Sequence, residues 1–340
     1  MRILEVKTEH VSPFKVLIEV LKDMLPEVNI EFRYDNIKSQ VEEIESDDEN
    51  DEDSDDEIID SDDEVTEEEI KSKKNKKDSK VVDKSGMRIM AVDTTKTVLI
   101  NLRLDANNFT KFKCKKKKLT LGVNLAYFYK LIKSVEKEDT LTLYVDHDDK
   151  NYLKIKIDSE NLKDSLVKLK LLDLAEDPMT VPDITFDAVV TMSSSEFHKI
   201  CREMNQIADY VEIKCLSNKI IFTCKGDSAE KSTTYRTGGE ALDGDCINIK
   251  HALSDKKDAP IIVQGIYELR NLVLFSKCAS LCNDIEIYMK NNYPLVIKYT
   301  VATLGRILLC LTPINEENAN YSDEDEFYSD DDIELLEEFL

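Results

Sequence analysis

The sequence predicts an α+β fold built from two similar halves, each with paired helices on a mostly antiparallel sheet. Three observations support this prediction: an internal repeat, amphipathic stretches with helical spacing, and short strands in which apolar and polar residues alternate. The length of 340 residues suggests about two domains. Two acidic segments lie outside the repeating pattern.

The net charge of −24 is concentrated in these two segments. Residues 42–69 contain 19 acidic and no basic side chains, and residues 316–340 contain 12 acidic and no basic ones. Removing both segments and the lysine-rich stretch 71–80, which has six lysines and one aspartate, leaves 40 basic against 38 acidic residues. The acidity of the whole chain therefore does not exclude a nucleic-acid partner for the folded part.

Other classes are disfavoured by composition. No apolar run approaches 18 residues, and the first ten residues lack the apolar segment of a signal peptide, so we expect no membrane association. The eight cysteines are scattered, and the two nearest neighbours, Cys278 and Cys282, lie four positions apart. This spacing favours reduced core residues over disulfides or zinc ligands.

The first half begins with an amphipathic helix that follows Ser12 and ends near Leu25. Strands are predicted at 28–32, 86–93 and 97–104, followed by a helix at 124–137 and strands at 140–145 and 152–157. The buried stripes of the two helices are Phe14, Leu17, Ile18, Leu21 and Leu25, and then Phe128, Leu131, Ile132 and Val135.

The second half repeats this order. Residues 193–195 precede a helix, strands are predicted at 211–215, 218–227 and 232–235, a second helix spans 267–278, and strands follow at 284–289 and 295–301. The buried stripes of its helices are Phe197, Ile200, Cys201 and Met204, and then Leu269, Leu272, Val273 and Phe275.

The spacing of the repeat locates an insertion. If residues 36–84 are set aside, Phe14 and Asp93 are 30 positions apart, as are Phe197 and Asp227. The acidic run then lies in the turn of a β-hairpin, where added length costs little. We expect an N-terminal domain at 1–168, a connector at 169–183, a C-terminal domain at 184–315 and an acidic tail at 316–340.

Basic residues recur on the polar faces of all four predicted helices. They are Lys15 and Lys22; Lys130, Lys133 and Lys137; Lys199 and Arg202; and Arg270 and Lys277. Lysines dispersed over helices attract phosphates without reading bases, which favours sequence-independent binding of duplex DNA. The alternative is that each face is an ordinary solvated surface.

At the level of motifs, the chain resembles the proliferating cell nuclear antigen family of DNA sliding clamps. The matching stretches are LKDML at 21–25, GMRIMAVDTTKTVLINL at 86–102, LGVNLAYFYKLIK at 121–133, SSSEFHKICREMNQIAD at 193–209, LRNLVLFSKC at 269–278, and then YPLVIKY and LTP. The resemblance implies the DNA clamp fold and a ring, usually of three identical subunits, whose helices line a hole around duplex DNA. It implies a processivity factor that serves a DNA polymerase and a clamp loader, in DNA repair as well as replication.

The resemblance also implies an apolar pocket that binds partner peptides of the form QxxLxxFF. The matching positions are Val92, Lys96, Thr97, Leu99, Met179, Val181, Pro294, Cys310, Thr312 and Pro313. Cys310 stands where the family often has an aromatic residue, and Lys96 where it often has histidine, so the preferred peptides are expected to differ. Ring closure is expected between edge strands near 162–170 and 228–236.

An enzyme is not expected. The four histidines are dispersed, no cluster has the spacing of metal ligands, and there is no phosphate-binding glycine loop or nucleophile elbow. No cofactor or metal is predicted. The alternative function is that of an acidic interaction protein that binds histones or mimics DNA. The cellular site is expected to be the nucleus, or a cytoplasmic replication site if the source is a large DNA virus.

The acidic segments carry two further predictions. Ser46, Ser54, Ser61 and Ser329 each precede acidic residues, a pattern typical of acidic-directed kinase sites. At the C-terminus, Ile333, Leu336, Phe339 and Leu340 have the spacing of the partner peptide, so the tail is a candidate ligand for the chain's own pocket.

Overall fold

The computed structural model describes residues 1–34, 85–159, 164–175, 184–238, 247–251 and 262–314. These residues form four α-helices, two short 3₁₀ helices and three antiparallel sheets. Three predicted segments lie outside the described residues: the insertion, the part of the connector that contains its prolines, and the acidic tail. The predicted kinase-site serines and the predicted tail ligand belong to these segments and therefore also lie outside.

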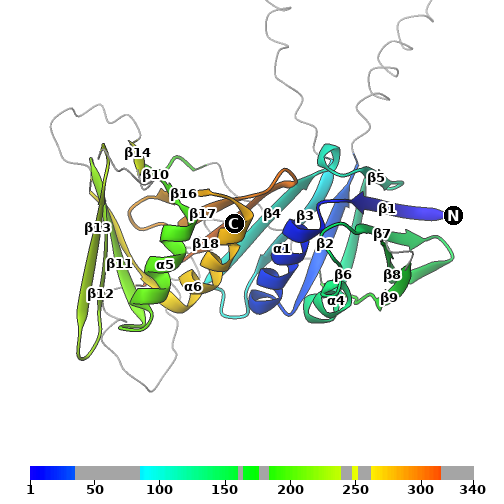
Figure 1. Cartoon of the computed structure of the whole chain (residues 1–340), viewed down its shortest axis with the longest axis horizontal. Coiled ribbons are helices and arrows are strands. Elements are labelled where there is room, and N and C mark those ends of the chain that lie inside the picture. The colour runs from blue at the N-terminus through cyan, green and yellow to red at the C-terminus, as the bar shows by residue number, and fades with distance from the viewer. Residues whose placement is uncertain (35–84, 160–163, 176–183, 239–246, 252–261, 315–340) are drawn as a thin grey trace, which may run out of the picture.

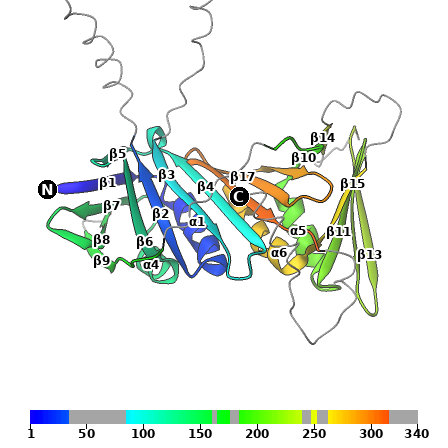
Figure 2. The same cartoon turned by 180° about the vertical axis from the view of Figure 1, so that it is seen from behind.

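The four helices pack against one another on one side of the sheets (Figure 1). They are α1 (Val11–Met24), α4 (Leu125–Ile132), α5 (Ser194–Met204) and α6 (Leu269–Ser276). Helix α1 packs on α4 and α5 on α6, while α1 also contacts α6. Seen from behind, strands β2, β3 and β4 lie in front of α1 (Figure 2).

Each half has a sheet of its own. The first has the order β5 (Lys111–Cys114), β1 (Arg2–Thr8), β7 (Thr140–Asp146), β8 (Asp149–Asp158), β9 (Ser165–Lys170). The second has the order β13 (Glu230–Arg236), β12 (Lys219–Lys225), β11 (Tyr210–Leu216), β15 (Val263–Glu268). Strands β9 and β13 are edge strands of these two sheets.

A nine-stranded sheet joins the two halves. Its order is β14 (Asn248–His251), β10 (Ala188–Ser193), β16 (Asp284–Met289), β17 (Leu295–Val301), β18 (Gly305–Leu311), β4 (Val98–Asp105), β3 (Gly86–Val92), β2 (Glu27–Arg33), β6 (Lys118–Asn124). Strand β18 of the second half pairs with β4 of the first, with Leu309 opposite Ile100. The two halves therefore share one continuous sheet.

The hairpins β2–β3 and β11–β12 occupy equivalent places in the two halves. In the second, Leu216 is opposite Lys219, so the turn contains two residues. In the first, Arg33 is opposite Gly86, and the acidic insertion lies between them in sequence. Gly86 has a φ of 148°, and a Cβ atom there would lie 2.1 Å from the carbonyl oxygen of Leu104, so only glycine fits where the chain re-enters the sheet.

The main core lies between the helices and the sheets and runs through both halves. The predicted helical stripes are in it; Phe14, Phe128, Phe197 and Phe275, one from each helix, are fully buried. The described cysteines are free thiols, and burial raises the pKa of Cys201 and Cys278. No helix in the described ranges is long and apolar enough to cross a membrane.

The structure corrects one predicted helix boundary. The second helix was expected to reach residue 137, but α4 ends at Ile132, and the backbone N–H of Val135 donates to Ile132 in a turn. Lys137 therefore lies beyond the helix rather than on its face. Strand β9 continues to Lys170, where its backbone is still paired with β8, so it includes the first two residues of the predicted connector, whose bounds stay a prediction.

Candidate functional site

The four helices lie on the side of the sheets that Figure 1 shows in front, and they carry most of the predicted basic residues, while Lys133 and Lys137 follow α4 and Lys277 follows α6. Most of these side chains are exposed: Lys130, Lys133, Lys137, Lys199, Arg202, Arg270 and Lys277. Lys15 and Lys22 are half-buried. The surface is continuous because α1 contacts both α4 and α6, which come from different halves.

Lys15 has a structural role that the helical pattern did not reveal. Its Nζ donates to the carbonyl oxygens of Lys133 at 3.1 Å and Val135 at 2.9 Å. These carbonyls follow the C-terminal end of α4, where intrahelical donors are missing and a cation is favourable. Lys15 therefore ties α1 to α4, and its role in DNA binding stays a prediction.

Asp23 links the two halves on this surface. Its carboxylate accepts from Lys22 at 2.6 Å and from Lys277 at 2.8 Å, and Lys277 follows α6 of the second half. Partial burial opposes ionisation, but the two ammonium groups hold the pKa of Asp23 below its ordinary value of 3.8. Lys22 and Lys277 are thus partly neutralised before any ligand binds.

Other cations on the surface are less engaged. Arg270 pairs with Glu268 at 3.2 Å, and Lys199 with Glu196 at 3.7 Å. Lys130 lies 5.0 Å from the ring centroid of Tyr127, a cation–π contact that leaves its charge intact. Among the described residues, no carboxylate forms an ion pair with the remaining exposed cations, which are Lys130, Lys133, Lys137 and Arg202.

The opposite face of the nine-stranded sheet has an apolar cluster of its own, called here the outer apolar cluster. Its buried residues are Leu99, Val296 and Cys310, from β4, β17 and β18. Half-buried apolar residues surround them: Met90, Val92, Ile184, Phe186, Tyr288, Tyr293 and Leu308. The cluster is separate from the main core because alternate residues of each strand point to opposite faces.

The two predicted ring edges are free strand edges in this chain. Strand β9 pairs only with β8, and β13 only with β12, in the described structure. On β9, the side chain of Leu166 is 58% exposed, which is unusual for a leucine in a strand. On β13, Lys231 is paired with Glu203 at 2.5 Å.

Comparisons with known proteins agree with this geometry. The model of the proliferating cell nuclear antigen C-terminal domain matches residues 180–314, and that of the N-terminal domain matches residues 69–178. The chain belongs to the proliferating cell nuclear antigen family. The predicted fold class, two similar α+β halves of the DNA clamp type, is confirmed.

Individual relatives cover different shares of their lengths. A probable DNA polymerase sliding clamp of Acanthamoeba polyphaga mimivirus is 34% identical over 74% of this chain and 53% of that protein. A probable DNA polymerase sliding clamp 1 of Paramecium bursaria Chlorella virus 1 is 30% identical over 68% of this chain and 85% of that protein. The chain thus spans about half of the mimivirus relative.

A cellular relative and a solved structure also match. The proliferating cell nuclear antigen of Chaetomium thermophilum is 28% identical over 67% of this chain and 85% of that protein. The crystal structure of proliferating cellular nuclear antigen from Entamoeba histolytica has a TM-score of 0.69 at 21% identity, and covers 93% of this chain and 100% of that chain. The match to this solved structure supports the fold.

The pocket residues implied by the family lie around the outer apolar cluster. Val92, Leu99 and Cys310 belong to it, and Pro294 is buried next to its member Tyr293. The other predicted pocket residues within the described ranges lie at its margin. There the backbone N–H of Thr312 donates to the carbonyl oxygen of Thr97 at 3.1 Å. Lys96 is exposed in a turn, and Pro313 is half-buried. Met179 and Val181 lie outside the described residues.

Sequence reasoning missed several members of this cluster. Met90, Tyr288, Val296 and Leu308 were not predicted, although each alternates with a core residue in its strand. A signal was present: the strand sequences ILLCL and LVI are apolar at consecutive positions, which indicates that both faces of the strand are covered.

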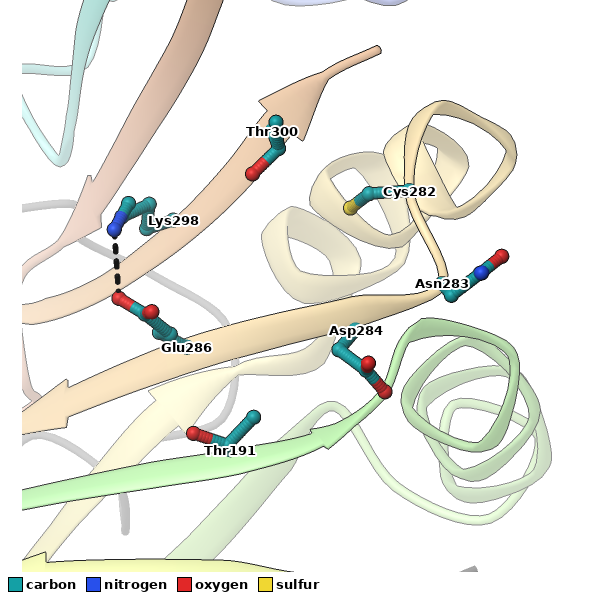
Figure 3. Close-up of a pocket in the computed structure, with 7 residues that line it drawn as sticks. All are labelled: Thr191, Cys282, Asn283, Asp284, Glu286, Lys298 and Thr300. Carbon is teal, nitrogen blue, oxygen red and sulfur yellow. Dashed lines mark hydrogen bonds and ion pairs between the residues drawn. The ribbon is translucent and has the colours of Figure 1, made fainter. Parts of the chain in front are cut away.

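A polar pocket of about 390 Å³ adjoins the same face (Figure 3). Glu286, Lys298 and Thr300 line part of it, with Lys298 Nζ 2.8 Å from a Glu286 carboxylate oxygen. Thr191, Cys282, Asn283 and Asp284 complete the lining. Within the described ranges, no group of three or more histidine, cysteine or acidic side chains is placed to hold a metal ion.

Proposed function

We propose that this chain is a subunit of a DNA sliding clamp, a ring that encircles duplex DNA and acts as a processivity factor for a DNA polymerase. The family and its fold support this proposal. The observation that carries it is the basic surface on which helices of both halves meet, because a clamp must hold phosphates without reading bases. The ring itself needs no active site.

Ring closure is proposed between β9 of one subunit and β13 of the next. Both strands are free edges, and pairing them would satisfy backbone groups that otherwise invite uncontrolled association. The two edges lie at the far ends of the molecule (Figure 1), the arrangement that head-to-tail assembly requires. We propose three identical subunits.

Partner binding is assigned to the outer apolar cluster. A peptide of the QxxLxxFF type places apolar side chains on one side of a helical turn, and a sheet face with half-buried apolar residues suits it. The proposed partners are a DNA polymerase, a clamp loader, and repair proteins that carry such peptides. The proposed site of action is the nucleus, or a cytoplasmic replication site if the source is a large DNA virus.

The alternative, an acidic protein that binds histones or mimics DNA, is not favoured. It accounts for the acidic segments but leaves the basic helix surface and the two family matches unexplained.

The experiment that tests DNA binding is a salt titration. Replacing Lys130, Lys133, Lys199, Arg202 and Lys277 with alanine should weaken binding of a labelled blunt duplex, and each lost phosphate contact should lower the slope of log affinity against log salt by about 0.9. The matched control replaces five exposed lysines that lie outside the helices: Lys113, Lys115, Lys116, Lys117 and Lys225. A slope that falls only in the control would place the DNA path elsewhere.

A further inference from the structure

The connection between β5 and β6 concentrates positive charge in a few residues. Its sequence is KCKKKKL at 113–119. The backbone is fixed on both sides, because the N–H of Lys115 donates to the carbonyl oxygen of Ile3 at 3.0 Å and the N–H of Tyr34 donates to that of Lys117 at 3.2 Å. Four lysines with exposed side chains, called here the lysine turn, are thus held within five consecutive residues: Lys113, Lys115, Lys116 and Lys117.

The lysine turn has no carboxylate partner in the described part of the chain. None of its four ammonium groups forms an ion pair there. Glu5 is opposite Lys113 in the sheet, but its carboxylate accepts from Arg2 at 2.8 Å and from Lys111 at 2.6 Å. Like charges gathered in one turn repel one another, so the turn favours an anionic ligand.

The other carboxylate on a neighbouring strand is also engaged. Glu31 of β2 pairs with Arg33 and with Lys118, the latter at 3.2 Å. Lys118 follows the lysine turn directly and is not counted in it for this reason. The charge of the four remaining lysines is therefore not offset by the strands that surround them.

The acidic insertion is attached to the sheet next to this turn. Arg33, the last residue of β2, is opposite Gly86 on one side, where the chain re-enters the sheet, and opposite Lys118 on the other, where β6 begins. Figure 2 shows β5 beside this end of β2. The acidic run, residues 42–69, begins eight positions after Tyr34. Because a chain spans at most about 3.6 Å per residue, Glu42 lies no more than about 29 Å from Tyr34.

Charge and attachment point to the acidic run as the ligand. It has 19 acidic and no basic side chains, whereas the six lysines of residues 71–80 can offset only part of that charge. The acidic tail leaves from the other end of the strands: β18 ends at Leu311, opposite Val98, while Gly86 is opposite Asp105. A tethered ligand attached close to its site has a high effective concentration.

We propose that the lysine turn binds the acidic run of the same chain. The contact consists of several weak, exposed ion pairs, so it depends on salt and needs no single geometry. It neutralises a basic turn that lies outside the four helices, and this turn then does not compete with the helix surface for DNA phosphates. The inference goes beyond the proposed function, and its first test needs no DNA.

The first test measures how fast the lysines of the full-length protein react with acetic acid N-hydroxysuccinimide ester. This reagent acylates uncharged amines, and a bound carboxylate slows the reaction because it favours the ammonium form. Chymotrypsin cleavage after Phe112 and Leu119 releases the turn as one peptide, whose acetylation is measured by mass spectrometry. The comparison protein, the run-neutralised variant, is a full-length chain in which every aspartate and glutamate of residues 42–69 is replaced with asparagine or glutamine.

The turn of the run-neutralised variant should react about ten-fold faster than that of the native protein at low salt, the combined effect of roughly four weak exposed ion pairs. High salt should remove the difference. The matched control neutralises the 12 acidic residues of 316–340 in the same way and should leave the turn as slow as in the native protein. Peptides that contain Lys150 and Lys225, exposed lysines elsewhere, should react equally in all three proteins. Thermal unfolding checks that each variant is folded.

Four results of this test would overturn the proposal. Equal reactivity of the turn in the native protein and the run-neutralised variant would refute the contact. A faster reaction only in the tail control would assign the turn to the acidic tail. A rise confined to the lysines of residues 71–80 would show that the run pairs with those lysines instead. A slow reaction that is lost on dilution would assign the run to a neighbouring copy.

The second test asks what the contact does for DNA binding. The run-neutralised variant should bind a labelled blunt duplex about ten-fold more tightly than the native protein at low salt, because the four lysines become available to phosphates. Adding Lys115→Gln, Lys116→Gln and Lys117→Gln should reverse most of this gain. Adding Lys150→Gln, Lys225→Gln and Lys250→Gln instead, three exposed lysines elsewhere, should not. A gain that survives the substitutions in the turn would show that the run acts through the overall charge and not through the lysine turn.

Discussion

The edge strand β9 offers the sharpest test of the assembly. Leu166 projects from this strand with 58% of its side chain exposed, on the face opposite the buried Leu169. Nothing in the described part of the subunit covers this side chain, whereas pairing with a neighbouring β13 would cover it. Replacing Leu166 with aspartate should therefore convert the ring into single subunits.

The size of the effect follows from the exposed fraction. Complete burial of a leucine side chain contributes about 1.5–3 kcal/mol, so covering the exposed 58% contributes about 1–2 kcal/mol at each interface. Placing a carboxylate there adds a desolvation cost of about 1–3 kcal/mol, part of which the neighbouring Lys168 would offset. A total of about 3 kcal/mol weakens each interface roughly 100-fold.

Sedimentation velocity near the wild-type dissociation constant measures this change directly. The control is Ile262→Asp, which replaces another exposed apolar residue, 45% exposed, immediately before edge strand β15. This variant should sediment like the wild type, because β15 is not proposed to form the ring. If Leu166→Asp also retains the wild-type mass, the assignment of β9 to the interface is wrong.

Three further predictions concern stability and the pocket. Gly86→Ala should destabilise the protein by at least about 2–3 kcal/mol, measured by urea unfolding, because a Cβ atom there collides with the carbonyl of Leu104; a smaller effect would mean that the strand can shift. Asp23→Asn should cost about 0.5–1 kcal/mol at neutral pH, since it removes both ion pairs to Lys22 and Lys277. The lowered pKa of Asp23 means that its contribution is present above pH 3.8 and is lost as the pH falls through the folded-state pKa, so variant and wild type should unfold alike in stronger acid. A chain that ends at Glu317 should bind a QxxLxxFF peptide more tightly than the full chain if the tail competes for the pocket, and equal affinities would exclude such competition.

The sequence predicted the elements that depend on local periodicity. Strands β16 and β17 have the predicted bounds, because β16 alternates between apolar and polar residues and β17 begins directly after Pro294. Strands β1, β6 and β18 were not predicted as elements. The pairing of β18 with β4 also could not be predicted, because the two strands are about 200 residues apart and nothing local records their register.

The sequence predicted which helix faces carry the basic residues, but it did not predict the hydrogen bonds and ion pairs that these residues form. Lys15 has the spacing of an exposed helical residue, yet its ammonium group is captured by two carbonyls that follow α4. Those carbonyls are available because α4 ends at Ile132, earlier than the apolar pattern suggests. The role of a helical lysine is therefore decided by where a neighbouring helix ends.

The two faces of the nine-stranded sheet separate two tasks. Successive residues of a strand point to opposite faces of the sheet. When the face covered by the helices buries one residue, the next residue in the strand must therefore point to the outer face. On β4 this rule places Leu99 on the outer side, in the apolar cluster, and its neighbour Ile100 in the main core. A substitution that shifted β18 by one residue against β4 would turn Cys310 toward the core and disperse the cluster. The proposed partner binding therefore depends on the pairing of β18 with β4, which joins the two halves.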